Sequence, residues 1–551
     1  MLILSRITLE TAKEHNMAES KIPGHLAYEL DAKAAGNPDA VVVTFENGEF
    51  APEALTYKDI VIQGRKIANN LIRAGIGKGD TFALLMRNHP EFIYAIYAAT
   101  SIGAVMVPID PRVKGERLKY VLTDAKAKGI FASSEFLENV SSVLPDLPGV
   151  QMLGVAYKEG MNIPADDRYP SLNEIYSQGE MSPPDRRNED VNVPIEIIYT
   201  SGTTGDPKGV VIKASRLVPF SNLAQFVWQY TAQDKLYTGL SLTHGNAQAV
   251  TLIPSLMLSI PSVISSKFTK SRIWDVCRTF GCTTFSLLGG MMMGIYSETP
   301  KPDDADNPVR LVLSAGTPYA IWEDFEKRFN VMIHEWYGAV EGGFAHKPPG
   351  VGPVGSFGKP LEGLMEMKVV DENGNDSPLG NTGEIIFRML GQKTEVEYLG
   401  KKQASEEKTR GGWLRTGDMG HTDEAGWFFF DYRAGGGLRR SGDFIQPQYV
   451  EAAIAIHPDV SDVCVYGIPA ASGAPGESDL VAAVVPREGV VIDPASLFIH
   501  CRRKLEGNAV PSYLQMVDAI PKSASEKNLD RLLKDDFQPY AGNVFIASDF
   551  C

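Results

Sequence analysis

The sequence predicts an α/β protein: a large N-terminal domain of mixed sheets and helices, followed by a small, mobile α+β C-terminal domain. Its 551 residues exceed the size at which one hydrophobic core stops growing, so at least two packed units are expected. Helical and buried-strand patterns alternate in the first part of the chain, which is typical of parallel β-α-β units. Beyond about residue 363 the pattern becomes β-rich, and three successive glycines interrupt it at residues 435–437.

The alternation can be followed element by element. Ile60, Ile67 and Leu71 recur at helical spacing, so the stretch 60–75 predicts a helix that ends in glycines. The other expected elements are a helix at 91–102 and strands at 81–86, 104–109, 130–132, 150–155, 195–199, 365–370, 383–388 and 427–431. We expect residues 1–432 to form the large domain, 433–437 the hinge and 438–551 the small domain.

Composition and charge restrict the function classes. Hydrophobic residues make up 44% of the chain and charged residues 22%, the balance of an ordinary globular protein. The formal net charge of −15 repels nucleic acid and anionic lipid, so neither is an expected partner. Five cysteines lack C-x-x-C or metal-ligand spacing and no secretory signal is visible, which favours reduced thiols in the cytoplasm. Pro254 and Pro261 interrupt the uncharged stretch 236–266 and argue against a membrane span.

The segment 195–211 carries the strongest chemical signal. Two apolar β-type runs are joined by a loop of hydroxyl and glycine residues that leads to Lys208. Backbone N–H groups, hydroxyls and a cation suit phosphate oxygens, so this loop is expected to hold a polyphosphate. It is not a Walker A loop, because Pro207 stands where that motif needs glycine and Lys208 is followed by Gly209 rather than by serine or threonine.

This loop resembles the phosphate loop of the adenylate-forming superfamily, which comprises acyl-CoA synthetases, peptide-synthetase adenylation domains and luciferases. Further motifs follow in the family's order from Leu55 to Lys527, so the resemblance covers nearly the whole chain, and it is strongest to the acyl-CoA synthetases. The resemblance implies that the phosphates of ATP are bound by Thr200, Ser201, Gly202, Thr203, Thr204 and Lys208. It also implies that Thr200 and Lys208 act in catalysis.

Three further motifs concern the nucleotide. Tyr337-Gly-Ala-Val-Glu341 is similar to the family's Tyr-Gly-x-Thr-Glu, which implies that Glu341, together with Thr204, holds Mg²⁺; Val340 replaces the usual threonine. The turn 314–318 resembles the family's turn that packs on adenine, and the segment 412–418 resembles the one that binds ribose. The nucleotide contacts implied by these motifs are Ala315, Gly316, Thr317, Trp336, Tyr337, Gly338, Asp418 and Arg433.

Two stretches resemble the family's acyl pocket, 240–248 and 286–293, although an ordinary structural role stays open for both. The acyl-pocket residues implied there and nearby are His244, Gly289, Gly290, Met291 and Gly338. The segment 439–447 resembles the small-domain segment whose glycine strand lines the tunnel for the CoA thiol. This implies tunnel contacts from Arg440, Ser441 and Gly442, where a glycine lets a narrow pantetheine arm approach the backbone.

The segment 521–527 resembles the family's C-terminal Pro-Lys-x-x-x-Gly-Lys motif, with Lys527 at the catalytic lysine and Glu526 in place of the glycine. The chemistry needs a cation there, because an anionic carboxylate must approach the α-phosphate of ATP. The resemblance implies that the catalytic residues are Glu341, Thr200, Lys208 and Lys527.

By resemblance, the expected activity is ATP-dependent ligation of a carboxylic acid to coenzyme A through an acyl-adenylate, with Mg²⁺ as the cofactor. An apolar, alicyclic or carnitine-like acid is expected, and base rates favour a homodimer. Two alternatives stay open: an adenylation enzyme that loads a carrier protein, and a nucleotide-binding protein without catalysis.

A Rossmann-like G-x-G-x-x-G at 350–355 is interpreted as a loop, because Pro353 precludes the helix which that motif opens.

Overall fold

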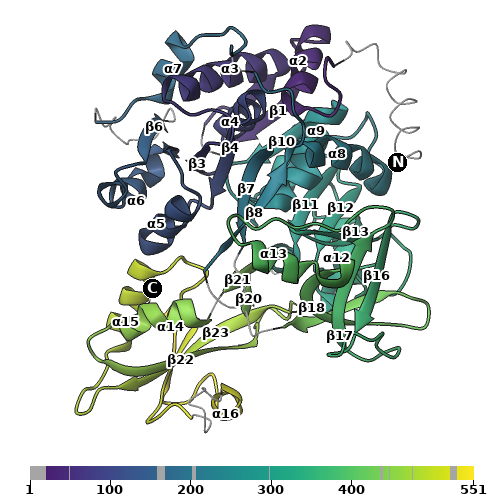
Figure 1. Ribbon diagram of the computed structural model, residues 1–551. Coiled ribbons are helices and arrows are strands. Elements are labelled where there is room, and N and C mark those ends of the chain that lie inside the picture. Colours follow the sequence, from purple (N-terminus) through teal and green to yellow (C-terminus); the bar gives the residue numbers. More distant parts are fainter. Residues whose placement is uncertain are drawn as a thin grey trace.

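The computed structural model describes residues 20–48, 50–157, 168–185, 187–200, 206–296, 298–434, 438–445, 447–474, 476–521 and 530–550. Figure 1 shows that the elements up to β19 (Phe428–Arg433) form the larger part of the molecule, and that the C-terminal elements, drawn in yellow-green, gather at one end of it. The glycines expected in the hinge, residues 435–437, lie outside the described residues.

A six-stranded sheet, counted over the described residues, contains the predicted β-α-β units. In spatial order its strands are β6 (Gln151–Ala156), β5 (Gly129–Ser133), β3 (Thr81–Leu85), β4 (Val105–Ile109), β7 (Pro194–Thr200) and β8 (Lys208–Lys213). Neighbouring strands are parallel except β7 and β8, which form an antiparallel hairpin. The connecting helices are α3 (Tyr57–Arg73), α4 (Pro90–Ile102), α5 (Gly115–Asp124), α6 (Leu137–Ser141) and α7 (Leu172–Gln178). Every strand and helix predicted up to residue 199 is confirmed, with small shifts at the ends.

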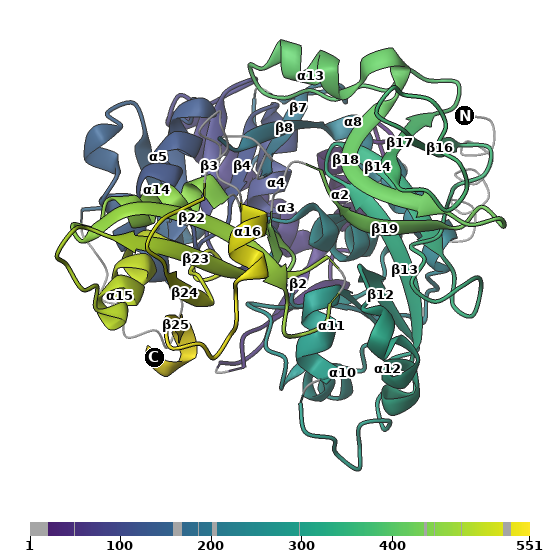
Figure 2. The ribbon, with the colours of Figure 1, turned by 90° about the horizontal axis from the view of Figure 1, so that it is seen from below.

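The second sheet of the large part has nine strands within the described ranges. Their order is β15 (Lys359–Pro360), β14 (Gly342–Lys347), β13 (Met332–Ala339), β12 (Leu311–Ala315), β11 (Thr284–Leu288), β9 (Leu236–Thr238), β10 (Ser262–Ser265), β1 (Val41–Glu46) and β2 (Glu53–Thr56). Three helices lie together beside it in Figure 2: α10 (Ile273–Phe280), α11 (Gly289–Tyr296) and α12 (Trp322–Phe329). Trp274, Phe285 and Phe325 form the core between these helices and the sheet.

Helices α3 and α4 pack between the two sheets. A single hydrophobic cluster joins Ile67 of α3, Ile96 of α4, Phe82 of the six-stranded sheet and Val43 of the nine-stranded sheet. The helices approach closely because residue 64 is glycine: a Cβ atom there would lie 2.3 Å from Cδ1 of Tyr97. A second cluster holds Ile109 at the end of β4 and Ile197 of β7, and both strands lead into the site described below.

The uncharged stretch 236–266 forms β9, the π-helical turn η3 (Ala247–Leu252), α9 (Ile253–Leu258) and β10. It packs beside α8 (Ala214–Trp228), and Val250 of η3 is fully buried against Trp228 of α8. Among the described residues, no helix is both long and apolar enough to cross a membrane.

The predicted β-rich region forms a four-stranded antiparallel sheet in the described part of the chain. Its strands are β16 (Met365–Val370), β17 (Gly383–Met389), β18 (Leu414–Thr422) and β19. The strand expected at 427–431 begins one residue later and extends to Arg433. Residues 350–355 lie in turns and bends, as the interpretation of the Rossmann-like motif predicts. The short helix α13 (Lys402–Lys408) precedes β18.

The C-terminal elements have a hydrophobic core of their own, which includes Val450, Ile454, Leu480 and Phe498. Their described strands form the sheet β22 (Val460–Pro469), β23 (Ser478–Pro486), β24 (Tyr513–Met516) and β25 (Val544–Ile546). The helices are α14 (Pro447–Ala455), α15 (Pro494–Lys504) and α16 (Asp530–Asp535). A separate hairpin, β20 (Leu438–Arg440) and β21 (Asp443–Ile445), lies between this sheet and the large part.

Candidate active site

A cavity of about 960 Å³ lies between the large part and the C-terminal elements. The large part contributes most of its walls, and the small part contributes the β20–β21 hairpin together with Glu506 and Asn508. Of the residues predicted from the sequence, those that line it are Thr200, Lys208, His244, Ala315, Gly316, Thr317, Trp336, Tyr337, Gly338, Glu341, Asp418 and Gly442. Segments more than 200 residues apart in the sequence therefore meet at one place.

Other predicted residues lie elsewhere. The cavity lining does not include Gly289 or Met291, and the partly buried Met291 packs against two hydrophobic cores of the large part. The surroundings of Gly290 lie outside what the structure describes. Arg440 is directed to the small part's own backbone, where its Nη1 donates to the carbonyl oxygens of Asn508 (3.3 Å) and Val510. Ser441 is likewise absent from the lining.

Several predicted residues fall outside the described residues. These are Ser201, Gly202, Thr203 and Thr204 of the expected phosphate loop, and Lys527 with its neighbour Glu526. The backbone of Arg433 is described and pairs with Asp418 across β18 and β19. The roles that the resemblance implies for these residues stay predictions.

The two ends of the expected phosphate loop are held together by the β7–β8 hairpin. Thr200 ends β7 and lies opposite Lys208, which begins β8. The Lys208 ammonium lies 5.3 Å from the centre of the Tyr398 ring. The Tyr398 hydroxyl donates to Oε1 of Glu341 at 2.9 Å. One end of the cavity thus contains the Lys208 cation, the Glu341 carboxylate and the end of β7, which leads into the expected phosphate loop.

Arg216, a residue that the sequence analysis did not single out, lies at the same end. Its Nη1 donates to the Val340 carbonyl oxygen at 2.7 Å, next to Glu341. Protein atoms surround the guanidinium, and this burial lowers the pKa of Arg216 while the charge of Glu341 opposes the shift. The side chain nevertheless remains accessible from the cavity. An arginine that projects into a cavity is suited to bind an anion.

The predicted adenine turn is held by a buried carboxylate. Glu335 accepts hydrogen bonds from the backbone N–H of Gly316 (2.6 Å) and Thr317 (3.3 Å) and from the Thr317 hydroxyl (2.5 Å). Burial raises the pKa of Glu335 to about 7, although these hydrogen bonds act in the opposite direction. Glu335 therefore fixes the turn that the sequence analysis identified, without itself having been identified.

Asp418 is also buried and precisely placed by neighbours at the other side of the cavity. Its Oδ2 accepts from the Tyr337 hydroxyl at 2.6 Å, and its backbone N–H donates to Thr416 Oγ1 at 2.9 Å. The Tyr337 ring packs on Phe357 with the ring centres 4.6 Å apart. Two of the motifs recognised in the sequence, at 337–341 and 412–418, are joined by this hydrogen bond.

The β20–β21 hairpin brings the small part to the cavity. Gly442 lies in its turn, with φ of 84°, and Ser441 before it has φ of 54°. The expectation of a glycine within a strand is therefore wrong, because two successive residues with positive φ form a tight hairpin turn. A Cβ atom at Gly442 would lie 2.6 Å from Cδ1 of Leu288 in the large part, so a side chain there would require Leu288 to move as well as straining the positive φ.

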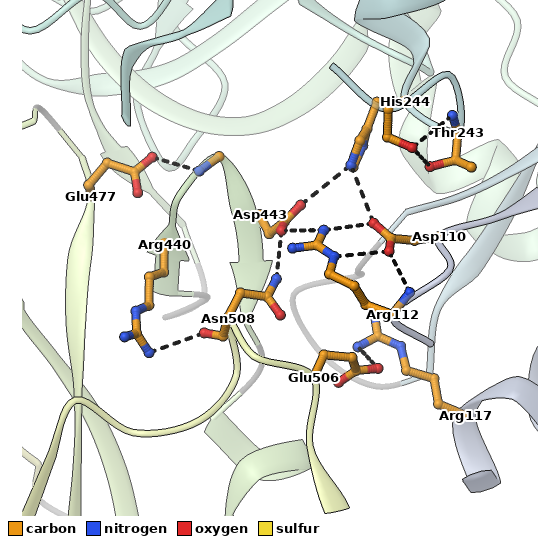
Figure 3. Close-up of polar contacts among 12 residues, drawn as sticks. Asp110, Arg112, Arg117, Thr243, His244, Arg440, Asp443, Glu477, Glu506 and Asn508 are labelled. Atoms are coloured by element: carbon orange, nitrogen blue, oxygen red, sulfur yellow. Dashed lines mark hydrogen bonds and ion pairs between the residues drawn. The ribbon is translucent and has the colours of Figure 1, made fainter. Parts of the chain in front are cut away.

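Polar contacts cross from the large part to the small part beside the hairpin (Figure 3). Arg112 donates two hydrogen bonds to Asp110 (2.9 and 2.6 Å), and its Nη2 also donates to Oδ2 of Asp443 at 2.9 Å. Asn508 Nδ2 donates to the same Asp443 oxygen at 2.6 Å. Nε2 of His244 lies 3.8 Å from Asp110 and 3.6 Å from Asp443. His244 thus faces the cavity from between two carboxylates.

Arg112 controls the ionisation of this group. Burial alone would raise the pKa of Asp110, but the hydrogen bonds and the charge of Arg112 outweigh it and hold that pKa below its usual value.

A second contact reinforces the junction: Arg117 Nη1 lies 3.5 Å from Oε1 of Glu506, whose other oxygen accepts from the Tyr449 hydroxyl at 2.9 Å. The two parts are therefore joined by paired charges rather than by an apolar surface alone.

The opposite end of the small part carries the segment that follows Lys527. Helix α16 begins at Asp530, and Figure 1 places it at the end of the small part that is remote from the large part. In this arrangement the hairpin, and not α16, faces the cavity.

Comparison with known proteins supports the resemblance seen in the sequence. The AMP-binding enzyme family matches residues 30–392, and the AMP-binding enzyme C-terminal domain matches residues 449–527. A crotonobetaine/carnitine–CoA ligase of Salmonella agona is 27% identical over 513 residues, which cover 90% of this chain and 96% of the relative.

Solved structures share the fold. A product-analogue complex of a double mutant of Bacillus subtilis o-succinylbenzoate CoA synthetase has a TM-score of 0.76, with 22% identity and coverage of 92% of this chain and 98% of that one. The acyl-adenylate complex of the same synthetase, also 22% identical, covers 93% and 98% of the two chains but has a TM-score of 0.63.

Proposed function

The chain belongs to the AMP-binding enzyme family, and on that premise we propose that it is an ATP-dependent carboxylic acid–CoA ligase that works through an acyl-adenylate. In the first half-reaction, a carboxylate oxygen of the acid attacks the α-phosphorus of ATP and diphosphate leaves. In the second, the thiol of coenzyme A loses its proton and attacks the acyl carbonyl carbon, and AMP leaves. One observation carries the proposal: Thr200, Lys208, Glu341 and Asp418 line a single cavity, to whose lining the small part also contributes.

The nucleotide would extend across this cavity from the phosphate end to Asp418. Lys208 and the loop that follows Thr200 would bind the phosphates. The turn at Gly316, held by Glu335, would pack against the adenine, and the Asp418 carboxylate would accept hydrogen bonds from the ribose hydroxyls. Tyr337 orients Asp418 for this contact through its 2.6 Å hydrogen bond.

Glu341 is the described residue that fits a Mg²⁺ ion. Among the described residues no three His, Cys, Asp or Glu side chains cluster as a metal site. A lone carboxylate is nevertheless suitable, because Mg²⁺ in nucleotide sites is bound through one or two carboxylates together with the substrate phosphates. When bound, the ion would offset the negative charge of the phosphates. Glu341 is held in place for this role by the Tyr398 hydroxyl.

The acid would occupy the apolar part of the cavity between β7 and α8. Ile198, Leu217, Phe220 and Ile253 line this region, next to His244. These side chains suit an apolar or alicyclic body, and the carnitine ligase among the relatives supports a small acid of the carnitine type. Arg216 lies between this region and Glu341, where it would offset charge as the carboxylate approaches the phosphate.

The small part would present different groups in the two half-reactions. Its hairpin now lines the cavity with Gly442, which is the arrangement proposed for thiol entry. The higher TM-score of the product-analogue complex compared with the adenylate complex supports the same interpretation. For adenylate formation, the small part would rotate about residues 433–437 and present Lys527.

The test separates the half-reactions. Lys527→Ala is expected to reduce acid-dependent pyrophosphate exchange at least ~100-fold, because the transition-state cation is lost, and to leave thioester formation from supplied acyl-AMP within about twofold of wild type. Lys534→Ala is the matched control: this lysine of α16 forms an ion pair with Asp530 and lies seven positions beyond Lys527. Equal loss in both half-reactions would contradict the two-arrangement mechanism.

Product analysis distinguishes the proposal from its alternatives. Acyl-CoA and AMP are the expected products when a panel of acids is supplied with ATP, Mg²⁺ and CoA. Pyrophosphate exchange without acyl-CoA would favour an adenylation enzyme for a carrier protein. ATP binding without AMP from any acid would favour a nucleotide-binding protein that does not catalyse ligation.

A further inference from the structure

A buried carboxylate lines the acid side of the cavity and takes no part in the proposed chemistry. Glu196 lies on β7 and is fully buried. Its Oε1 accepts a hydrogen bond from Nε2 of Gln248 at 2.7 Å, whereas Oε2 has no hydrogen-bond partner among the described residues. Buried carboxylate oxygens are rarely left unpaired, so this atom requires an explanation.

The strand geometry places Glu196 at the end of the pocket that is remote from the phosphates. Side chains on a strand alternate between its faces, so Glu196, Ile198 and Thr200 point to the same side, and all three line the cavity. Four residues of strand separate Glu196 from Thr200 by about 13 Å. A molecule that extends along this face would meet the phosphate end first and Glu196 last.

Gln248 is itself fixed, so the pair forms a rigid end to the pocket. Its Nε2 also donates to the Leu242 carbonyl oxygen at 2.9 Å. Gln248 belongs to the π-helical turn η3, a conformation that is frequent at functional sites. Asn246, just before this turn, also lines the cavity, and within the described part of the chain neither its Nδ2 nor its Oδ1 has a hydrogen-bond partner.

The charge at this place is not compensated. Burial raises the pKa of Glu196 to about 7, the Gln248 hydrogen bond only partly opposes the shift, and no lysine, arginine or histidine of the described part contributes to it. A buried carboxylate is costly unless a donor or a cation satisfies it. An apolar pocket with one such group at its end is suited to a ligand that carries the missing donor.

We propose that Glu196 and Asn246 form the far end of the acid pocket and select carboxylic acids that carry a hydrogen-bond donor, a hydroxyl or an ammonium group, remote from the reacting carboxylate. This inference rests on the proposed ligase function and specifies its substrate class. Gln248 is a positioning residue that holds Glu196 and closes the pocket behind it, so long unbranched apolar chains are excluded.

The experiment compares acids that differ only in their terminal group. For each chain length from four to eight atoms, the panel contains an acid with a terminal methyl, one with a hydroxyl and one with an ammonium group in the same place. The readout is kcat/KM for CoA-dependent release of AMP. Wild type is expected to prefer the hydroxyl or the ammonium acid over the methyl acid at least ~10-fold at the best length, because a methyl group would leave the buried carboxylate unpaired.

Glu196→Gln tests the residue with nearly unchanged volume. The preference for the donor acid is expected to fall to about threefold or less, mainly through KM, while kcat/KM for the methyl acid and KM for ATP stay within about twofold. Glu46→Gln is the control for the loss of a buried carboxylate in the large part, since Glu46 pairs with Arg272 and Ser265 and does not line the cavity. It is expected to leave the preference unchanged.

The outcomes separate this inference from the function on which it rests. Equal use of methyl and donor acids by wild type, or an unchanged preference in Glu196→Gln, would overturn the inference and leave the ligase intact. The wild-type comparison decides even if the variant does not fold. Absence of AMP from every acid would refute the ligase function and this inference with it.

Discussion

The contact between Arg112 and Asp443 offers the sharpest test of how the two parts cooperate. Arg112 follows β4 in the large part and Asp443 begins β21 of the hairpin, so the pair exists only while the hairpin faces the cavity (Figure 3). We consider Arg112→Gln, Asp443→Asn and the double variant. Asp443→Asn removes one charge and keeps the size of the side chain, whereas Arg112→Gln shortens the side chain and also removes its hydrogen bonds to Asp110.

The structure sets the size of the effect. The distance between Arg112 Nη2 and Asp443 Oδ2 is 2.9 Å, but the side chains are 45% and 18% exposed. Solvent therefore screens the pair, and we expect a coupling free energy of about 1 kcal/mol, at the upper end for exposed ion pairs. A difference of about 1 kcal/mol changes the ratio of the two arrangements about fivefold.

The two half-reactions provide the assay. Thioester formation from supplied acyl-AMP is expected to slow about fivefold in Asp443→Asn, because fewer molecules have the hairpin at the cavity. Acid-dependent pyrophosphate exchange should be unchanged or slightly faster. The effect should decline as salt is raised from 0.1 M toward 1 M, because screening weakens an exposed pair.

Lys119→Gln is the control, since Lys119 forms an exposed ion pair with Asp146 within the large part. It should leave both half-reactions as they are. The reasoning is refuted if both half-reactions lose activity equally, or if the double-mutant cycle gives less than about 0.3 kcal/mol, the usual error of additivity.

Two further predictions follow from single side chains. Arg216→Gln is expected to reduce pyrophosphate exchange ~10-fold or more and to spare thioester formation. Lys213 is an exposed neighbour outside the cavity, so Lys213→Gln should change neither half-reaction. Equal effects of the two variants would contradict a role for Arg216 in the cavity. Asp234→Asn tests stability: burial would raise the pKa of Asp234, but hydrogen bonds from Arg310, Thr283 and Thr231 lower it to about 2. A folded-state pKa below the ordinary value stabilises the protein above about pH 4, and this contribution is lost as the pH falls toward 2. Denaturant unfolding should therefore show a loss of about 2 kcal/mol for Asp234→Asn at pH 7 that shrinks below pH 4, and a pH-independent loss would contradict the assignment.

Local patterns in the sequence were sufficient for strands β3 to β7 and for β16, β17 and β19, but they predicted no strand of the nine-stranded sheet or of the C-terminal sheet. The helix at 60–75 and the strands at 81–86 and 365–370 were found because apolar periodicity and turn residues are properties of neighbouring positions. The same holds for Thr200, Lys208 and Asp418, which lie within recognisable motifs and line one cavity. The turn at Gly442 was mistaken for strand because a single glycine does not show whether the residue before it also adopts a positive φ.

The residues that were missed act through contacts between distant segments. Glu196 stands within the apolar run 195–199, where nothing marks it as different from a polar residue on the exposed face of a strand. Its importance depends on Gln248, 52 positions away. Glu335 next to Trp336 gave no signal either, because its function is to hold a turn 18 positions earlier. A pattern search that reads neighbouring residues cannot detect such pairs.

The strength of the interdomain contact also follows from what the proposed mechanism requires. A small part that must leave the cavity between half-reactions cannot be joined to it by a large apolar surface, because the cost of separation would exceed the binding energy available from substrates. The observed junction includes two charge pairs in which solvent still reaches the arginine: Arg112 with Asp443, and Arg117 with Glu506 at 3.5 Å. We expect the more exposed pair, Arg112 with Asp443, to favour one arrangement by about 1 kcal/mol and to separate readily in water. The close fit of Gly442 against Leu288 then supplies geometry rather than affinity, since any side chain at this positive φ would strain the turn and would require the tip of Leu288 to move.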